Sequence, residues 1–175
     1  MSEQTTTFKQ GDPIVHPSHG AGRIISIPRR RVGGVERQYY CIELVNDHGT
    51  LMIPVERAEA SGLRKATLDA AGILDILSAE PNELDDDHRK RQAEIELRIR
   101  SGDAELVTQA LRDLAWREHN DSLTERDQKL KSEAEALVIG ELALQPDLDL
   151  ESAATQLHQH LAEAIDAQPD LNGQE

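Results

Sequence analysis

The stretch FKQGDPIVHPSHGAGRII, residues 8–25, decides the fold of the first part of this chain. Ile14 and Val15 are typical of an extended strand, and the run IISI at residues 24–27 resumes one. Glycine suits turn positions that need a positive φ angle, and proline interrupts a strand ladder. The residues that break the pattern between the two strands are Pro17, Gly20 and Gly22. We therefore predict a strand, a tight turn and a second strand.

Two further extended runs follow, at residues 38–45 and 50–55. The turn signals that precede them are Gly33-Gly34 and the sequence NDHG at residues 46–49. The connections are too short for crossover helices, so parallel pairing is unfavourable. The first part of the chain therefore predicts a small antiparallel β-barrel, or a strongly bent sheet, of four to five strands.

After Gly62 the apolar residues change to helical spacing, as Leu68 and Leu77 show. Asp103 and Thr124 each precede an apolar stripe and can cap a helix N-terminus. We predict about five helices, which end near Pro81, Arg100, Asn120, Pro146 and Ala167. The fold class is therefore α+β, with a β domain at residues 1–62, an all-α domain at residues 63–168 and a polar tail at residues 169–175.

The cysteine count and the hydropathy of the chain indicate where the protein works. The single cysteine, Cys41, cannot form an intramolecular disulfide, which is compatible with a reducing cytoplasm. No run approaches the roughly 18 apolar residues of a membrane span. The first residues, MSEQTTT, lack the basic and apolar regions of a signal peptide. We expect a cytoplasmic protein with no membrane partner.

Charge is distributed unevenly over the chain, whose net charge is −14. Residues 1–64 hold eight Lys and Arg against seven Asp and Glu, a net charge of +1, whereas residues 65–175 hold eleven against twenty-six, a net charge of −15. A uniformly acidic surface repels nucleic acid. Any DNA contact therefore needs a local basic patch, and residues 88–100, with five Lys and Arg against two Glu, form the main one in the helical half.

Two pairs of histidines raise the question of a metal site. His16 and His19 are close in sequence, but no Cys, Asp or Glu completes a ligand set beside them. We interpret their segment as a structural turn, with direct partner contact as the alternative. His158 and His160 are two residues apart on a predicted helix and so do not share a face. No Ser/His/Asp set, phosphate-binding loop or acid pair stands out, and we expect no metal, no cofactor and no enzymatic activity.

Several motifs, in the same order, resemble those of the CarD/CdnL family of bacterial RNA polymerase-binding transcription regulators. The resemblance spans residues 8–143, and its first part is similar to the polymerase-interaction domain of transcription-repair coupling factors. Besides the opening stretch, it is carried by TLMIP at residues 50–54, Gly62-Leu63-Arg64, Ser101-Gly102-Asp103 and Gly140-Glu141-Leu142-Ala143. It implies a Tudor- or SH3-like barrel followed by a helical domain.

The resemblance implies a polymerase-binding surface that includes Arg30, Met52 and Pro54. In the family, the barrel pairs with a lobe of the polymerase β subunit, a basic hairpin residue takes part, and a Met-x-Val-Pro segment lies on the polymerase-facing strand. From the residues alone, the arginines at 29–31 also fit a solvated loop and residues 50–54 an ordinary core strand. An exposed strand edge offers backbone groups to a partner strand, and Pro54 fits a strand end or an edge.

The resemblance also implies a DNA-contacting surface, for which a solvated helix face is the alternative. The family commonly shows Trp-Ser-Arg-Arg ahead of Ser-Gly-Asp; the Trp wedges into the minor groove at the upstream edge of the melted promoter, and the Arg residues contact phosphates. Counting back from residues 101–103 places His88, Arg89, Lys90 and Arg91 at these positions. His88 departs from the pattern, since imidazole buries less apolar area than indole. Gln128 stands where the family has a DNA-contacting Lys, with Lys129 beside it.

These implications leave two alternatives for function. In the first, the protein is a transcription regulator that docks on the polymerase β subunit and stabilises the promoter open complex through weak, non-sequence-specific DNA contact. Docking raises the effective concentration of even a weak basic patch, which answers the objection from charge. In the second, the protein is an adaptor that binds polymerase or another partner and has lost DNA contact. In both cases we expect a monomer.

Overall fold

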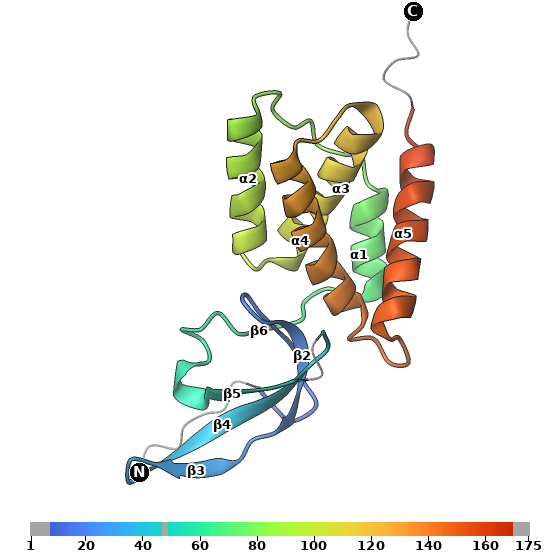
Figure 1. The fold of residues 1–175 in the computed structure, drawn as a ribbon. Coiled ribbons are helices and arrows are strands. Elements are labelled where there is room, and N and C mark those ends of the chain that lie inside the picture. The colour runs from blue at the N-terminus through green and yellow to red at the C-terminus, as the bar shows by residue number, and fades with distance from the viewer. Residues whose placement is uncertain (1–7, 47–48, 170–175) are drawn as a thin grey trace, which may run out of the picture.

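The computed structural model describes residues 8–46 and 49–169. Within these residues the N-terminal part forms one antiparallel sheet of six strands, and five helices follow (Figure 1). The α+β fold class expected from the sequence is confirmed. The strands are β1 (Pro13–His16), β2 (Gly20–Ser26), β3 (Arg29–Val32), β4 (Val35–Leu44), β5 (Thr50–Pro54) and β6 (Arg64–Lys65), and a short 3-10 helix, η1, occupies Val55–Arg57.

Strand β4 organises the sheet because it is long enough to pair with three neighbours. Its first half pairs with β3, and its second half pairs with β2 and β5. Strands β1 and β6 extend the sheet beyond β2, and in the described residues the order β3-β4-β2-β1-β6 does not return to its start. The expected small antiparallel β domain is therefore present as an open sheet.

The predicted opening hairpin is confirmed, and Gly20 and Gly22 have different structural roles in it. Strands β1 and β2 pair from His16 opposite Gly20 outward. Gly20 has a φ angle of +81°, as the turn requires. Gly22 instead lies within β2, where a Cβ atom would come within 2.6 Å of the Glu43 carbonyl oxygen of β4. The absence of a side chain at Gly22 therefore lets two strands approach each other closely.

The β3–β4 hairpin contains a strand that the sequence did not reveal. Gly33 and Gly34 have φ angles of +62° and +82°, which suits a tight hairpin turn with positive φ at both central residues. Residues 29–31 of β3 are all arginine, and this triplet carries none of the β-branched or aromatic residues that mark a strand. Pairing with β4, rather than local propensity, therefore makes this segment extended.

The five expected helices are present in the described residues. They are α1 (Ala70–Ser78), α2 (His88–Arg100), α3 (Ala104–Asn120), α4 (Glu125–Leu142) and α5 (Leu150–Asp166). The predicted caps are confirmed: the Asp103 carboxylate accepts hydrogen bonds from the first turn of α3, and Thr124 forms a capping box with Asp127. Helix α4 ends at Leu142, one turn before the expected end near Pro146.

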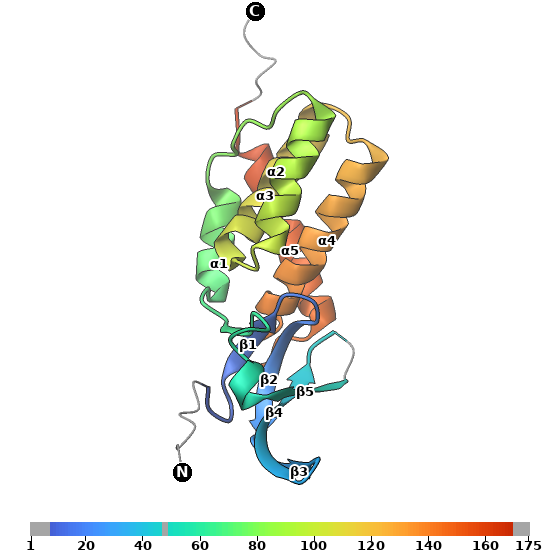
Figure 2. The same cartoon turned by 90° about the vertical axis from the view of Figure 1, so that its left-hand side faces the viewer.

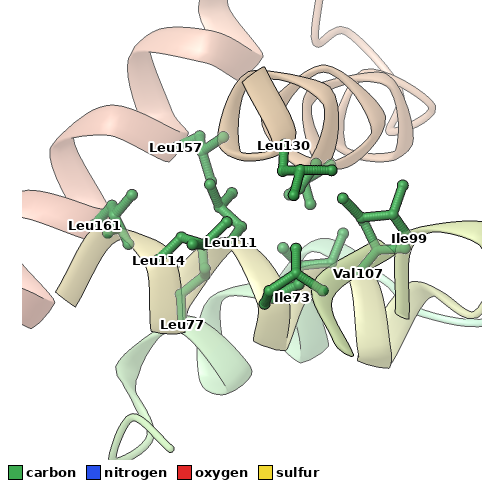
Figure 3. Packing of buried hydrophobic residues seen from close by; sticks show 14 of the residues in the cluster. Ile73, Leu77, Ile99, Val107, Leu111, Leu114, Leu130, Leu157 and Leu161 are labelled. Carbon is green, nitrogen blue, oxygen red and sulfur yellow. The ribbon is translucent and has the colours of Figure 1, made fainter. Parts of the chain in front are cut away.

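Each domain has its own hydrophobic core. In the β domain, Tyr40 and Ile42 of β4 are fully buried, and the Phe8 ring meets the Tyr40 ring edge-on at 5.5 Å between centroids. The larger core lies between the helices (Figure 3). Its most deeply buried large side chains, each at most 1% exposed, are Ile73, Leu77, Ile95, Leu111, Leu114, Leu130, Leu142 and Leu157.

The two domains are stacked end to end (Figures 1 and 2). The β3–β4 hairpin projects from the end of the β domain that faces away from the helices. The N-termini of α2 and α4 lie at the opposite end of the molecule. A surface on the hairpin and a surface at these helix ends can therefore contact different partners at the same time.

The structure adds detail to the domain limits. The sheet takes in β6, at Arg64–Lys65, and so extends past the boundary expected at residue 62. The expected polar tail at residues 169–175, apart from Pro169, and residues 47–48 of the NDHG turn lie outside the described residues. In the part of the chain that the structure describes, no helix combines the length and the apolar character needed to cross a membrane.

Candidate functional site

Strand register places Arg30, Met52 and Pro54 on one face of the sheet. Directly opposed side chains of an antiparallel pair share a face, and so do alternate residues of one strand. The pairs are Arg30 with Arg37, Pro54 with Tyr39 and Met52 with Cys41, and their β4 members alternate. The part of this face that runs from the hairpin to Cys41, here called the outer sheet face, comprises Arg30, Val32, Val35, Arg37, Tyr39, Cys41, Met52 and Pro54.

The outer sheet face is apolar with basic side chains at the hairpin end. Val32 and Val35 are 54% and 53% exposed, which is unusual for large aliphatic side chains. Met52 and Pro54 are half-buried, whereas Ile53 between them points into the core. Residues 50–54 are therefore a core strand on one face only. Such a surface suits a partner that offers apolar side chains and carboxylates.

Strand β5 also has a free backbone edge. Among the described strands it pairs with β4 only, so its other side is not hydrogen-bonded to a strand. Pro54, which has no N–H group, ends the strand. An edge of this kind can accept an additional strand from a partner, with Met52 beside it to give specificity.

A second surface forms where α2 and α4 begin. A cavity of about 460 Å³, here called the distal groove, is lined by His88, Gln92, Thr124, Glu125, Arg126 and Lys129. His88 and Lys129 are 41 positions apart in the sequence, yet the packing of α2 against α4 brings them to the same groove. Arg89, Lys90 and Lys129 are all exposed near these helix starts.

Arg91 has a different position from the one expected for a phosphate contact. Its side chain is 3% exposed, and its Nη2 lies 2.8 Å from Asp127 Oδ2 of α4. Its Nη1 donates hydrogen bonds to the carbonyl oxygens of Asp85 and Asp86, at 2.8 and 3.1 Å. The guanidinium is therefore occupied inside the protein. Arg91 fixes the start of α2 against α4, and its neighbours, not Arg91 itself, face the solvent.

Asp127 receives several donors at this buried position. Besides Arg91, the Thr124 backbone N–H and hydroxyl donate to its carboxylate at 3.0 and 2.8 Å. Burial by itself raises the pKa of Asp127, but the hydrogen bonds from Arg91 and Thr124 outweigh it and lower the pKa to about 2. Asp127 therefore stays ionised at neutral pH, and the pair acts as a permanent link between the two helices.

The backbone at the start of α2 is less open to phosphate than an uncapped helix end. The Asp87 carboxylate accepts hydrogen bonds from the backbone N–H groups of Arg89 and Lys90, at 2.8 and 3.4 Å. These N–H groups are the ones that could otherwise bind an anion. Any phosphate contact at this end must therefore come from the side chains, and Lys90, 73% exposed, lies 4.0 Å from the Asp85 carboxylate.

The histidine turn has a structural explanation in the described residues. His16 is 9% exposed, and its Nδ1 accepts a hydrogen bond from the Ser18 backbone N–H at 3.1 Å. Burial lowers the pKa of His16, with a smaller contribution from His19. Among residues 8–46 and 49–169, no group of three or more His, Cys, Asp and Glu is arranged to hold a metal ion.

Comparison with known proteins finds one family model for each part of the chain. Residues 8–67 match the model of the CarD-like/TRCF RID domain, and residues 72–158 match the model of the CarD C-terminal domain. A curated relative, "Putative transcription factor YdeB" of Bacillus subtilis, is 28% identical over 137 residues, which cover 77% of this chain and 90% of that protein. The two matched segments contain the outer sheet face and the distal groove, respectively.

Proposed function

The chain belongs to the CarD-like family of transcription regulators, and from this premise we propose that it docks on the β subunit of RNA polymerase and stabilises the promoter open complex. Its DNA contact is weak and independent of sequence. It acts in the cytoplasm as a monomer and without a catalytic step, through binding alone. Its partners are polymerase and promoter DNA.

The outer sheet face carries the docking half of this proposal. It combines exposed aliphatic side chains, a basic hairpin and the free edge of β5 in one surface. A partner strand that adds to β5 gains backbone hydrogen bonds and lies beside Met52, and other parts of the partner can bury Val32 and Val35. Arg30 and Arg37 then face carboxylates of the partner. Arg37 also lies 3.2 Å from Glu56, which holds it in place beside β5.

The distal groove carries the DNA half, and it depends on docking. Lys90 and Lys129 are 73% and 67% exposed, but the helical half has a strongly negative net charge. Free duplex is therefore bound weakly. Once the β domain is attached to polymerase, the groove is held at a high effective concentration beside the promoter. A small basic patch then suffices.

Charge reversal at the groove tests the DNA half. Open-complex affinity falls as the salt concentration rises, and the slope of its logarithm against the logarithm of salt concentration reflects the number of phosphate contacts. In the double variant Lys90→Glu, Lys129→Glu we expect the magnitude of this slope to decrease by about two, because each lysine accounts for about one phosphate contact. The measurement is the equilibrium affinity of polymerase, with the protein bound, for a fluorescent promoter over a range of salt concentrations. Arg100→Glu, at the other end of α2, is the matched control and keeps the wild-type slope. An unchanged slope in the double variant would exclude these lysines as phosphate contacts.

A second candidate function is an adaptor that binds polymerase without touching DNA. Two observations favour it: His88 replaces the indole that the family uses as a wedge, and Arg91 is buried against Asp127. The variant His88→Trp separates the two candidates. If the groove already faces the promoter, an indole buries more apolar surface against the bases, and the open complex should last about tenfold longer. If the protein is an adaptor, the lifetime of the open complex stays unchanged.

A further inference from the structure

One arginine at the domain junction contacts two separate segments of the helical domain. Arg64 of β6 donates from Nη2 to Glu141 Oε1 of α4 at 2.7 Å and from Nε to the Gly102 carbonyl oxygen in the α2–α3 turn. Its Nη1 reaches the Lys65 carbonyl oxygen at 3.2 Å. Arg64, Gly102 and Glu141 each come from a different sequence motif. We call these three residues the interdomain clamp.

The residues around the interdomain clamp pack the two domains tightly against each other. Gly140, next to Glu141, lies where a Cβ atom would be 3.5 Å from the Ala21 Cβ atom of β2, so α4 packs directly on the sheet. A small apolar cluster of Val15, Ala21 and Leu144 fills the junction. On its other side, Arg23 of β2 donates to the Leu144 carbonyl oxygen at 2.8 Å. Two arginines of the β domain therefore hold the end of α4.

Burial of the Glu141 carboxylate at this junction is energetically unfavourable. Its side chain is 7% exposed, and its Oε2 has no hydrogen-bond partner in the described residues. Burial raises the pKa of Glu141, and the Arg64 guanidinium opposes that effect. An apolar pair could stabilise such a junction equally well, because buried ion pairs often contribute little net stability. An ion pair with the planar, forked guanidinium of arginine adds a defined geometry that an apolar contact lacks.

We propose that the interdomain clamp is a positioning device, which sets the angle between the β domain and the helical domain so that docking delivers the distal groove to one place on DNA. This inference rests on the proposed function. The β3–β4 hairpin, which carries part of the outer sheet face, and the starts of α2 and α4, which carry the distal groove, lie at opposite ends of the molecule (Figure 1), so a small rotation at the junction moves the groove by a large distance. A loose joint would spread the groove over a larger volume and lower its effective concentration at the promoter.

The test replaces the ion pair by an apolar one in the full-length chain, Arg64→Met with Glu141→Leu. Spin labels at Glu59→Cys and Glu163→Cys, both in exposed positions and with Cys41→Ser, report the distance between the domains. We expect a narrow distance distribution in the parent and a distribution at least about twice as broad in the variant. Thermal unfolding should be unchanged, because both cores are intact. Arg57→Met, an exposed arginine outside the clamp, is the control and keeps the narrow distribution.

Polymerase binding separates failure of the clamp from failure of the proposed function. The apolar variant should bind polymerase with the parent's affinity, whereas its effect on open-complex lifetime falls about tenfold. The conservative variant Glu141→Gln, which keeps a hydrogen-bond acceptor for Arg64, should recover most of the narrow distance distribution. A distribution as narrow in the apolar variant as in the parent would overturn the proposal, whether or not polymerase binds. Absence of polymerase binding by the parent would instead contradict the proposed function. The distance distributions would then still decide whether the clamp fixes the angle between the domains.

Discussion

Asp127→Ala is expected to destabilise the protein by about 3–5 kcal/mol, because it leaves the Arg91 charge buried without its counter-ion. The Arg91 side chain is 3% exposed and the Asp127 side chain is fully buried, so water cannot replace the lost partner. The measurement is urea unfolding followed by the fluorescence of Trp116, which lies in α3 and lines a small cavity with Leu77 of α1 and Leu161 of α5, so it reports on the same helical domain. Lys129→Ala, an exposed position on α4, is the control and should change stability by less than about 0.5 kcal/mol.

The double variant tests whether the loss comes from the pair. Arg91→Ala alone should destabilise to a similar degree, because it strands the Asp127 carboxylate. With both residues replaced, neither charge is stranded, and the loss should be smaller than the sum of the two single losses. Additive losses would show that Arg91 and Asp127 act independently. A loss of under about 1 kcal/mol for Asp127→Ala would contradict the assignment of a buried structural pair.

Met52→Glu is expected to weaken polymerase binding at least about thirtyfold, the effect of losing a central contact in an interface. The substitution places a carboxylate on the apolar part of the outer sheet face, where docking removes water. Because Met52 lies on the face away from the core, folding stability should stay nearly unchanged. Surface plasmon resonance with immobilised polymerase measures the affinity, and urea unfolding measures the stability.

Arg30→Glu serves as the electrostatic counterpart of this variant. It should slow association and reduce the salt dependence of binding, because Arg30 is exposed at the hairpin end of the same face. Lys9→Glu, an exposed position before β1, gives the same change in net charge outside the outer sheet face. Equal effects of Arg30→Glu and Lys9→Glu would mean that total charge, and not this face, governs the association.

Local signals in the sequence predicted most of the fold. The opening hairpin, the five helices and the caps Asp103 and Thr124 were accessible, because turn residues, apolar spacing and capping side chains act over a few positions. Strand β3 could not be predicted from local signals, because its arginines carry no strand signal and only its pairing with β4 makes it extended. The open form of the sheet likewise depends on contacts between distant segments.

The candidate site shows the same division. The burial of Arg91 could have been predicted, since Arg91, Ile95 and Ile99 repeat at four-residue spacing and so share the buried face of α2. Asp127 lies in the same way on the stripe of α4 that includes Leu130 and Ala134. Opposite charges on two apolar stripes are a signal for a buried pair. Only helix packing decides that these two charges face each other and that His88 lines the same groove as Lys129.

The motifs that mark the family had no visible purpose in the sequence. Gly62-Leu63-Arg64, Ser101-Gly102-Asp103 and Gly140-Glu141-Leu142-Ala143 are far apart in the chain. In the structure each contributes to the junction between the domains, through Arg64, Gly102 and Glu141. No local pattern could have shown this, because the contacts depend on the placement of one domain on the other.

The claim that attachment comes from protein and not from DNA is tested most directly by two titrations of the same fluorescent full-length chain at physiological salt, one with RNA polymerase and one with bare promoter duplex. The account predicts a saturating, micromolar or tighter association with polymerase, which Met52→Glu weakens at least about thirtyfold, and no saturation with duplex at the same concentrations. Binding to bare duplex as tight as binding to polymerase, or no detectable association with polymerase, would contradict it.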